Sequence, residues 1–425
     1  MIFAILYNNS GHMNAEYFVY PFLIAALYFE VFLLLTFLSA PARARRARPA
    51  TSSHTPSVAM VVPCWNEGPT IVGTVQSLLS LDYPKDKLSV VVVDDGSTDS
   101  SKEELKVFEG HPRVKVIHQE NAGKHAALNT GINAAEGVEL VGCLDADSFV
   151  EHDALREIIP CFDEPKVAAA TVAMSVHEPK NLLEAIQNAE YILGIALRHA
   201  LSAVNGIYVT PGPFSLYRRD IVLAVGGFRH GHQAEDMEMA LRLQREGYWI
   251  ENAPKARVYT NVPRTVPKLI KQRTRWTTGF LRNVIYDYRD LVGNPKYGTL
   301  GLLVLPLGFA AIAGGVFLFC LAISLFIYNS LKAYVVTNGV PLAYTLTPRL
   351  SLDFFYFPIT AMVLLTVVVA MGSIAFIIVG KRMSHTPSNI GIGIIGYLFV
   401  YGLIAPFWLL RAVADVATGT RRPWR

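Results

Sequence analysis

The fold of this chain is decided at residues 88–97, which read LSVVVVDDGS. A run of β-branched residues that ends in turn-forming residues predicts a buried strand, here Leu88–Val93, with Asp94 and Asp95 standing where it ends. Strand patterns of the same kind occur at Val58–Pro63, Val114–His118 and Glu139–Leu144, and helical patterns at Thr70–Leu81, Ser100–Gly110 and Lys124–Ala135. This alternation predicts an α/β domain with a mainly parallel sheet, in which functional residues gather at the carboxyl ends of the strands.

The chain as a whole is too apolar for an ordinary cytosolic protein. Of its 425 residues, 52% are hydrophobic and 17% are charged, so we expect it to be divided between membrane and aqueous parts. A bilayer core requires about 20 apolar residues, and four stretches are that long: Tyr17–Ala40, Leu300–Tyr328, Phe354–Gly380 and Ile390–Leu410. The lipid bilayer is therefore an expected partner. The net charge of +4 is mild, and nucleic acid is not an expected partner.

The distribution of positive charge predicts the topology. Four arginines directly follow the first apolar stretch, at Arg43, Arg45, Arg46 and Arg48, and the positive-inside rule places them in the cytoplasm. We therefore expect an N-terminal transmembrane helix and basic linker over residues 1–51, a cytosolic domain over 52–297 and about three transmembrane helices over 298–425. This organisation describes a multi-pass protein of the plasma (cytoplasmic) membrane.

The C-terminal tail conflicts with this topology. Strict counting of the spans places Arg421, Arg422 and Arg425 outside the cell, against the positive-inside rule. Either the last apolar stretch is re-entrant, with Pro406 interrupting it, or the rule does not hold at this end of the chain.

Two further helical patterns belong to the domain, over residues 181–204 and about 264–288. In both, apolar residues recur at helical spacing against polar or basic ones. Such helices either pack on the sheet or lie in the bilayer interface. We favour interfacial helices, because both flank the expected site and the second leads directly into an apolar stretch.

Acidic residues mark the ends of two of the expected strands. A carboxylate at Asp95 can accept hydrogen bonds from a nucleobase or a ribose, although an Asx turn explains the same residues. Asp145 and Asp147 repel each other unless a cation lies near, and a hard divalent ion with phosphate oxygens would supply it; this spacing is also common in surface turns. Lys124 opens a helix whose free N–H groups favour an anion, or it is simply a solvated lysine.

The remaining candidates lie nearer the end of the domain. Glu235 and Asp236 begin a helix, where acidic residues complement the helix dipole or, for Asp236, serve as a general base for a hydroxyl group. Gln272, Arg275 and Trp276 share one face of a later helix. There the guanidinium can pair with a diphosphate, the indole ring can carry a sugar and the amide can bind a hydroxyl group. An interfacial helix with tryptophan and arginine at headgroup level accounts for the same pattern.

In their order and spacing, these motifs resemble the processive family-2 glycosyltransferases of the GT-A fold, which are nucleotide-diphospho-sugar transferases. This group contains the cellulose, chitin, hyaluronan and poly-N-acetylglucosamine synthases. The resemblance covers residues 58–276 and the apolar stretches that follow. The motifs that carry it are DDGS at 94–97, GKHAALN at 123–129, DAD at 145–147, ED at 235–236 with Ala234 in place of the family's threonine, and QRTRW at 272–276.

The resemblance implies a role for each candidate. Donor and UDP binding would fall to Pro63, Asn66, Glu67, Asp95, Lys124, Asp145, Arg273 and Arg275. Acceptor binding would fall to Gln272, Trp276, Gly212 and Pro213. The last two belong to residues 211–219, which resemble the loop that lines the acceptor site. Asp236, with Glu235, would be catalytic. Asp147 would be the principal ligand of Mn²⁺ or Mg²⁺, with Asp145 beside it.

The resemblance also implies an activity. It is an inverting, metal-dependent and processive transfer from a UDP-sugar, for which UDP-N-acetylglucosamine is the expected donor, to a β-linked glycan acceptor, with the polymer passing between the membrane spans. One alternative is a non-processive membrane transferase that adds a single sugar to a lipid or short acceptor. A remoter one is a non-catalytic sugar-binding or transport protein. Oligomeric state and accessory subunits are left open.

Overall fold

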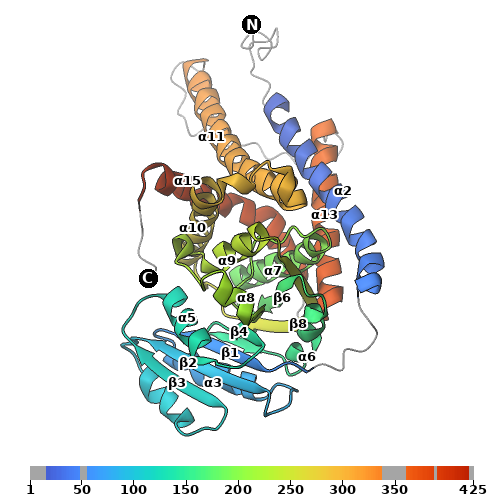
Figure 1. The fold of residues 1–425 in the computed structure, drawn as a ribbon. Helices are drawn as coiled ribbons and strands as arrows, with labels where there is room; N and C mark the ends of the chain where they lie inside the picture. Colours follow the sequence, from blue (N-terminus) through green and yellow to red (C-terminus); the bar gives the residue numbers. More distant parts are fainter. Residues whose placement is uncertain (1–15, 48–54, 337–359, 387–389, 421–425) are drawn as a thin grey trace. The chain divides into compact units, whose positions relative to one another are not determined.

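The structure, a computed structural model, describes residues 16–47, 55–336, 360–386 and 390–420. They fall into two compact units, which are described separately. The first spans Leu33–Leu307 together with the residues from Ile374 onward and contains the sheet (Figure 1). The second consists of helical segments before Leu33 and between Gly308 and Ser373.

Within the described residues, the first unit has an eight-stranded sheet with the order β3-β2-β1-β4-β7-β6-β8-β5. The strands are β1 (Val58–Cys64), β2 (Leu88–Asp95), β3 (Val114–Gln119), β4 (Leu140–Cys143), β5 (Ser148–Val150), β6 (Val167–Val176), β7 (Ser215–Arg218) and β8 (Trp249–Thr260). The first four pair in parallel, as do β6 and β8. Strands β7 and β5 run antiparallel to their neighbours. The predicted α/β class with a mainly parallel sheet is confirmed, and the half of the sheet beyond β4 is mixed.

The predicted helices of this unit lie close to their expected positions, and the short helices α6 and α8 are additional. In chain order they are α3 (Gly68–Leu79), α4 (Ser101–Leu105), α5 (Lys124–Ala134), α6 (Ala154–Ile158), α7 (Leu182–Ser202), α8 (Arg219–Ala224), α9 (Glu235–Arg245) and α10 (Val266–Arg282). Helix α7 begins with a capping box, in which Asn181 accepts from the backbone of Glu184 and the Glu184 carboxylate accepts from the backbone of Asn181.

Strand β1 is buried on both faces, which explains its unbroken apolar run. Met60 belongs to the same core cluster as Ile71 of α3. On the other face, Val61 contacts α5 so closely that a Cβ atom at Gly131 would lie 2.3 Å from its Cγ1. A glycine is therefore required for this approach. The tight contact fixes α5, and with it Lys124 at the start of α5, against the sheet.

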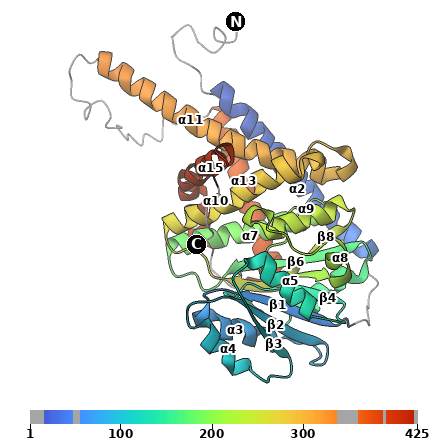
Figure 2. The same cartoon turned by 60° about the vertical axis from the view of Figure 1, so that its left-hand side comes forward.

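The helices over 182–202 and 266–282 pack on the last apolar segment of the chain (Figures 1 and 2). This segment consists of α14 (Gly391–Gly396), a π-helical turn (Tyr397–Tyr401) and α15 (Gly402–Ala417). Helix α14 contacts α7, α15 contacts α10, and α7 also packs on β6 and β8. Helix α7 thus lies between the sheet and this segment.

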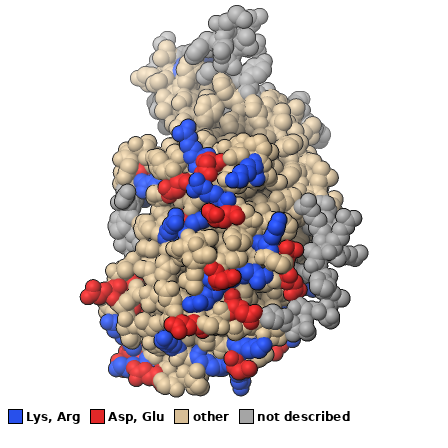
Figure 3. All heavy atoms as spheres, in the orientation of Figure 1, with Lys and Arg blue, Asp and Glu red and all other residues tan. Residues whose placement is uncertain are grey.

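Four helices of the described chain are long and apolar enough to cross a membrane. They are Phe18–Leu38 within α2 (Glu16–Ala47), Leu300–Lys332 with most of α11 (Leu305–Val336), Ala361–Ser384 (α13) and Gly391–Ala417. The third begins later than its predicted start at Phe354, and residues 354–359 lie outside the described residues. On the face in Figure 3, charged side chains gather over the sheet-containing domain. The chain is that of a membrane protein, as predicted.

Candidate active site

The loops after β1 and β2 are bonded to each other at the carboxyl edge of the sheet. The backbone N–H of Asn66 donates to Ser97 Oγ over 3.0 Å, and Asn66 Oδ1 accepts from the N–H of Thr98 over 2.7 Å. Asn66 has a φ of 56°, a left-handed conformation that asparagine tolerates better than most residues. Pro63 lies near the end of β1, and Asn66 and Glu67 lie in the loop behind it, beside the DDGS turn.

The carboxylate of Asp95 forms hydrogen bonds with the turn that precedes α5. Its carboxylate accepts from the backbone N–H groups of Ala122 and Gly123 over 3.0 and 2.9 Å and from Gln119 Nε2 over 2.7 Å. Gly123 has a φ of 92°, which a side chain would disfavour. Asp95 therefore fixes the turn that positions Lys124 at the start of α5.

Lys124 is the centre of the site. Its Nζ lies 2.6 Å from Asp145 Oδ1 and 3.1 Å from Glu235 Oε1. A Cβ atom added to Gly212 would come within 2.6 Å of the same Nζ and 2.8 Å of Asp145 Oδ1. Residues from α5, the turn after β4, the loop before β7 and the start of α9 therefore meet at one point. We refer to Lys124, Asp145 and Glu235 as the lysine cluster.

Two adjacent acids at the lysine cluster, Glu235 and Asp236, have pKa values that are shifted in opposite directions. Burial disfavours the charges of Lys124 and Glu235, but Lys124 and Arg275 outweigh burial at Glu235 and lower its pKa, while the neighbouring carboxylates raise the pKa of Lys124 well above its ordinary value. Burial and the adjacent Glu235 raise the pKa of Asp236 to about 6. Asp236 Oδ1 accepts from the N–H of Met237 over 2.8 Å. An acid with such a pKa can exchange protons near neutral pH.

Asp147 is the second acid with a raised pKa. Burial, the charge of Asp145 and the charge of Glu67 raise it to about 7. Carboxylates that destabilise one another in this way fit a hard divalent cation, which would relieve their repulsion. Among the described residues, no three His, Cys, Asp or Glu side chains lie close enough to form a complete metal site by themselves.

Two neighbouring arginines of α10 have different surroundings. Arg275 Nη1 donates to the carbonyl of Gln233 over 3.1 Å, and its charge acts on Glu235 and Asp236. The guanidinium of Arg273 is buried and faces α7, where its Nη2 lies 2.6 Å from Glu190 Oε2. The structure therefore brings Arg275, and not Arg273, next to the lysine cluster.

The expected acceptor residues divide between two places: Gln272 and Trp276 contact Arg273, and Gly212 contacts the lysine cluster. Trp276 packs against the core of the sheet and stacks on Arg273, whose guanidinium carbon lies 4.1 Å from the ring centroid. Gln272 Oε1 accepts from Arg273 Nη1 over 3.2 Å. Gly212 touches the lysine cluster and Pro213 beside it is buried.

Some supporting residues carry no signal in the sequence. Thr210 donates to the carbonyl of Asp236 over 2.9 Å and accepts from the hydroxyl of Tyr217 over 2.9 Å, so a strand of the sheet supports the backbone of the proposed base. Both are common residue types without a motif. Glu190 and Tyr401, which contact Arg273, were missed for the same reason.

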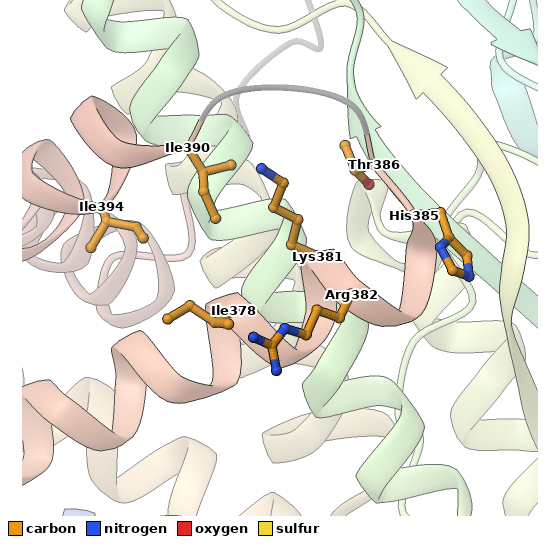
Figure 4. Close-up of a pocket in the computed structure, with 7 residues that line it drawn as sticks. All are labelled: Ile378, Lys381, Arg382, His385, Thr386, Ile390 and Ile394. Carbon is orange, nitrogen blue, oxygen red and sulfur yellow. The ribbon is translucent and has the colours of Figure 1, made fainter.

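A hollow of about 740 Å³ lies elsewhere, at the connection of α13 and α14 (Figure 4). It is lined by Ile378, Lys381, Arg382, His385, Thr386, Ile390 and Ile394. None of these belongs to the lysine cluster, so we place the chemistry at the sheet edge.

An acidic and basic cluster at the carboxyl edge of such a sheet is typical of proteins that bind a phosphorylated nucleotide. The fold is also that of a solved mannosyltransferase from Pyrobaculum calidifontis in complex with GDP-Man and Mn²⁺, with a TM-score of 0.55 and 22% identity over 86% of this chain and 99% of that one. The family model "Glycosyltransferase like family 2" matches residues 56–279. The chain belongs to this family and is a glycosyltransferase, which confirms the resemblance and the GT-A fold.

Curated relatives match the same part of the chain. Poly-beta-1,6-N-acetyl-D-glucosamine synthases of Staphylococcus aureus strain COL and of Staphylococcus epidermidis are each 31% identical over 243 residues. The match covers 56% of this chain and 58% of each relative, so it spans little more than half of their length.

Proposed function

We propose that this protein is an inverting, metal-dependent and processive glycosyltransferase that polymerises a UDP-sugar, with UDP-N-acetylglucosamine as the expected donor, into a β-linked glycan. The similarity to poly-beta-1,6-N-acetyl-D-glucosamine synthases supports a polysaccharide product. The observation that carries the proposal is Asp236, an acid whose pKa is raised to about 6 beside the lysine cluster.

In the proposed reaction, the Asp236 carboxylate removes the proton from an acceptor hydroxyl group. The acceptor oxygen forms a bond to the anomeric carbon as the bond to the diphosphate oxygen breaks, and UDP departs with the electron pair. Lys124 and Arg275 stabilise the charge that develops on the diphosphate. The bond forms opposite to the one that breaks, so the anomeric configuration inverts.

The remaining roles are proposed residue by residue. We assign the uridine end of the donor to Asp95, with Pro63, Asn66 and Glu67, and the acceptor sugar to Trp276 and Gln272. Asp147, with Asp145, would hold Mn²⁺ or Mg²⁺, which when bound neutralises the diphosphate charge. Arg273 would act on the acceptor side rather than on UDP, because Glu190 already pairs with it.

The proposed location is the cytoplasmic membrane, with residues 52–297 in the cytosol and the product passing between the helices on either side of this domain in the sequence. The basic residues after the first apolar stretch and the Lys381-Arg382 pair at the end of α13 support this orientation.

The purified protein in detergent, supplied with UDP-N-acetylglucosamine and Mn²⁺, should release UDP. The substitution Asp236→Asn should lower the rate by about 10²–10⁴-fold, the usual contribution of a general base. Glu246→Gln, at the exposed C-terminal end of the same helix, is the matched control and should leave the rate unchanged. Undiminished turnover in Asp236→Asn would remove the proposed base.

The product decides between polymerisation and single transfer. A ladder of glycans on a gel supports processivity, and a single-sugar adduct contradicts it. A panel with other UDP-sugars and with GDP-mannose identifies the donor, and chelation by EDTA followed by addition of Mn²⁺ or Mg²⁺ tests the metal.

A further inference from the structure

Arg273 is held in a closed network of side chains. Its Nη2 lies 2.6 Å from Glu190 Oε2 on α7, and its Nε donates to the hydroxyl of Tyr401 over 3.0 Å. The same hydroxyl donates to Glu190 Oε2 over 2.6 Å. Each of the three groups thus bonds to the other two. A buried cation requires such compensation, since an unpaired charge in this position is strongly unfavourable.

The network reaches Trp276, to which the proposed function assigns the acceptor sugar. The guanidinium carbon of Arg273 lies 4.1 Å from the centroid of the Trp276 ring and 5.7 Å from that of Tyr191. A planar guanidinium stacks on an aromatic face only when its plane is correctly turned. Two bonds, from Nε to Tyr401 and from Nη2 to Glu190, set that plane. The orientation of Arg273 therefore supports the orientation of Trp276.

One member of the network comes from the last apolar segment of the chain. Tyr401 ends the π-helical turn between α14 and α15, and its ring lies 5.5 Å from that of Tyr397 and 5.2 Å from that of Trp408. A π-helical turn inserts an extra residue into a helix and often occurs at functional sites. Here the turn packs on α7, and Tyr401 at its end accepts a hydrogen bond from Arg273 of α10.

We infer that Tyr401 and Glu190 are positioning residues for glycosyl transfer: they fix Arg273, and through it Trp276, in the orientation that receives the acceptor sugar. The inference rests on the proposed acceptor role of Trp276. It makes the last apolar segment part of the acceptor site, so that a shift of this segment changes acceptor binding without touching the donor.

The test compares two tyrosines of the same π-helical turn. Tyr401→Phe keeps the ring and removes the hydroxyl group that bonds to Arg273 and Glu190. Tyr397→Phe is the matched control, because the hydroxyl group of Tyr397 makes no hydrogen bond to a described residue. Both variants are made in the full-length protein and assayed with UDP-N-acetylglucosamine and a short oligosaccharide of β-linked N-acetylglucosamine.

We expect Tyr401→Phe to raise the KM for the oligosaccharide roughly tenfold, the effect of losing a hydrogen bond to a charged group. Release of UDP without acceptor should stay within about twofold, because the donor residues are unchanged. Equal KM values in Tyr401→Phe and Tyr397→Phe would overturn the inference. So would a parallel loss of acceptor-independent UDP release, which would indicate a general structural defect.

A second measurement does not depend on activity. In protein labelled with 5-fluorotryptophan, the ¹⁹F resonance of Trp276 is assigned through Trp276→Phe. Tyr401→Phe should shift this resonance and Tyr397→Phe should not. A shifted resonance in an enzyme that is inactive with every donor would contradict the proposed function and leave the network supported, whereas an unmoved resonance would overturn the network itself.

Discussion

Among the described residues, Lys124 forms ion pairs with Asp145 and Glu235 but not with Asp147 or Asp236. Asp145 and Glu235 lie within 3.1 Å of its ammonium group, whereas Asp147 and Asp236 are the acids with raised pKa values. Neighbouring carboxylates whose pKa values are pushed apart are typical of acid and base assignments in active sites. This division of the acids supports Asp236 as the base and Asp147 as the metal ligand.

The pKa of Asp236 predicts an acid limb in the pH profile. A general base must be ionised, and a pKa raised to about 6 means that its carboxylate is lost as the pH falls through 6. Turnover at saturating metal should therefore fall about tenfold per pH unit below 6 and be flat above it. Saturating metal is required because protons compete for Asp147 near pH 7. An acid limb near pH 4, the ordinary range of aspartate, would contradict the shift.

Gly212 predicts a second effect at the scale of one residue. The methyl group in Gly212→Ala would lie 2.6 Å from Lys124 Nζ and 2.8 Å from Asp145 Oδ1, too close for either to stay in place. Overpacking of this kind costs about 1–3 kcal/mol, and we expect the KM for the donor to rise roughly tenfold. Gly402→Ala is the control, because a methyl group there meets open space. An unchanged KM for the donor would show that Gly212 does not border the donor-binding site.

Helix α10 supports the base from outside the sheet. Arg275 donates to the carbonyl of Gln233, Asn283 Nδ2 donates to that of Gly231 over 2.9 Å, and Gly279 packs on Ala234. The turn that α10 contacts has left-handed residues, with Gln233 at a φ of 68°. Backbone in this region persists only when the surroundings hold it. Ala234, which replaces the family's threonine, belongs to this turn and is in close contact with α10.

This contact predicts the effect of Gly279→Ala. The added Cβ atom would lie 2.6 Å from Ala234 Cβ, so α10 and the turn before Asp236 must separate. We expect kcat to fall by about tenfold or more and the midpoint of thermal unfolding to decrease, in line with the cost of overpacking. Lys271→Ala, on the exposed face of the same helix, should change neither. A variant with normal kcat would show that the turn does not depend on α10.

Local patterns predicted the elements but not the partners of their side chains. The run at β2 and the motifs at Asp95 and Lys124 could be read directly, because strand ends and helix starts depend on nearby residues. The difference between Arg273 and Arg275 could not. Residues two positions apart in a helix point about 200° apart, and which of the two arginines faces the site depends on how α10 contacts α7 and a segment more than 100 residues later.

At the scale of the whole molecule, the last apolar segment follows the domain along its length. Near its start, Gly393 contacts the carbonyl of Ala185 on α7. At its end, Arg282 of α10 donates to the carbonyls of Asp415 and Thr420 over 2.9 and 2.7 Å. Between these contacts, one face of the segment is apolar and exposed, with Ile392, Ile395, Phe399, Leu403 and Phe407. A helix that contacts the same domain at both ends is better explained by an orientation in the plane of the bilayer interface than by a full crossing of the membrane.

This arrangement predicts that both ends of the last segment lie on the side of the membrane that holds the sheet. Residues 421–425 lie outside the described residues, so the test uses Thr418, which is exposed. Thr418→Cys and Lys102→Cys are each introduced into a Cys320→Ser background, in which the other three cysteines are buried. A membrane-impermeant maleimide should label both positions in inside-out vesicles and neither in right-side-out vesicles. Labelling of the two positions from opposite sides would show that the segment crosses the bilayer, and the tail arginines would then break the positive-inside rule.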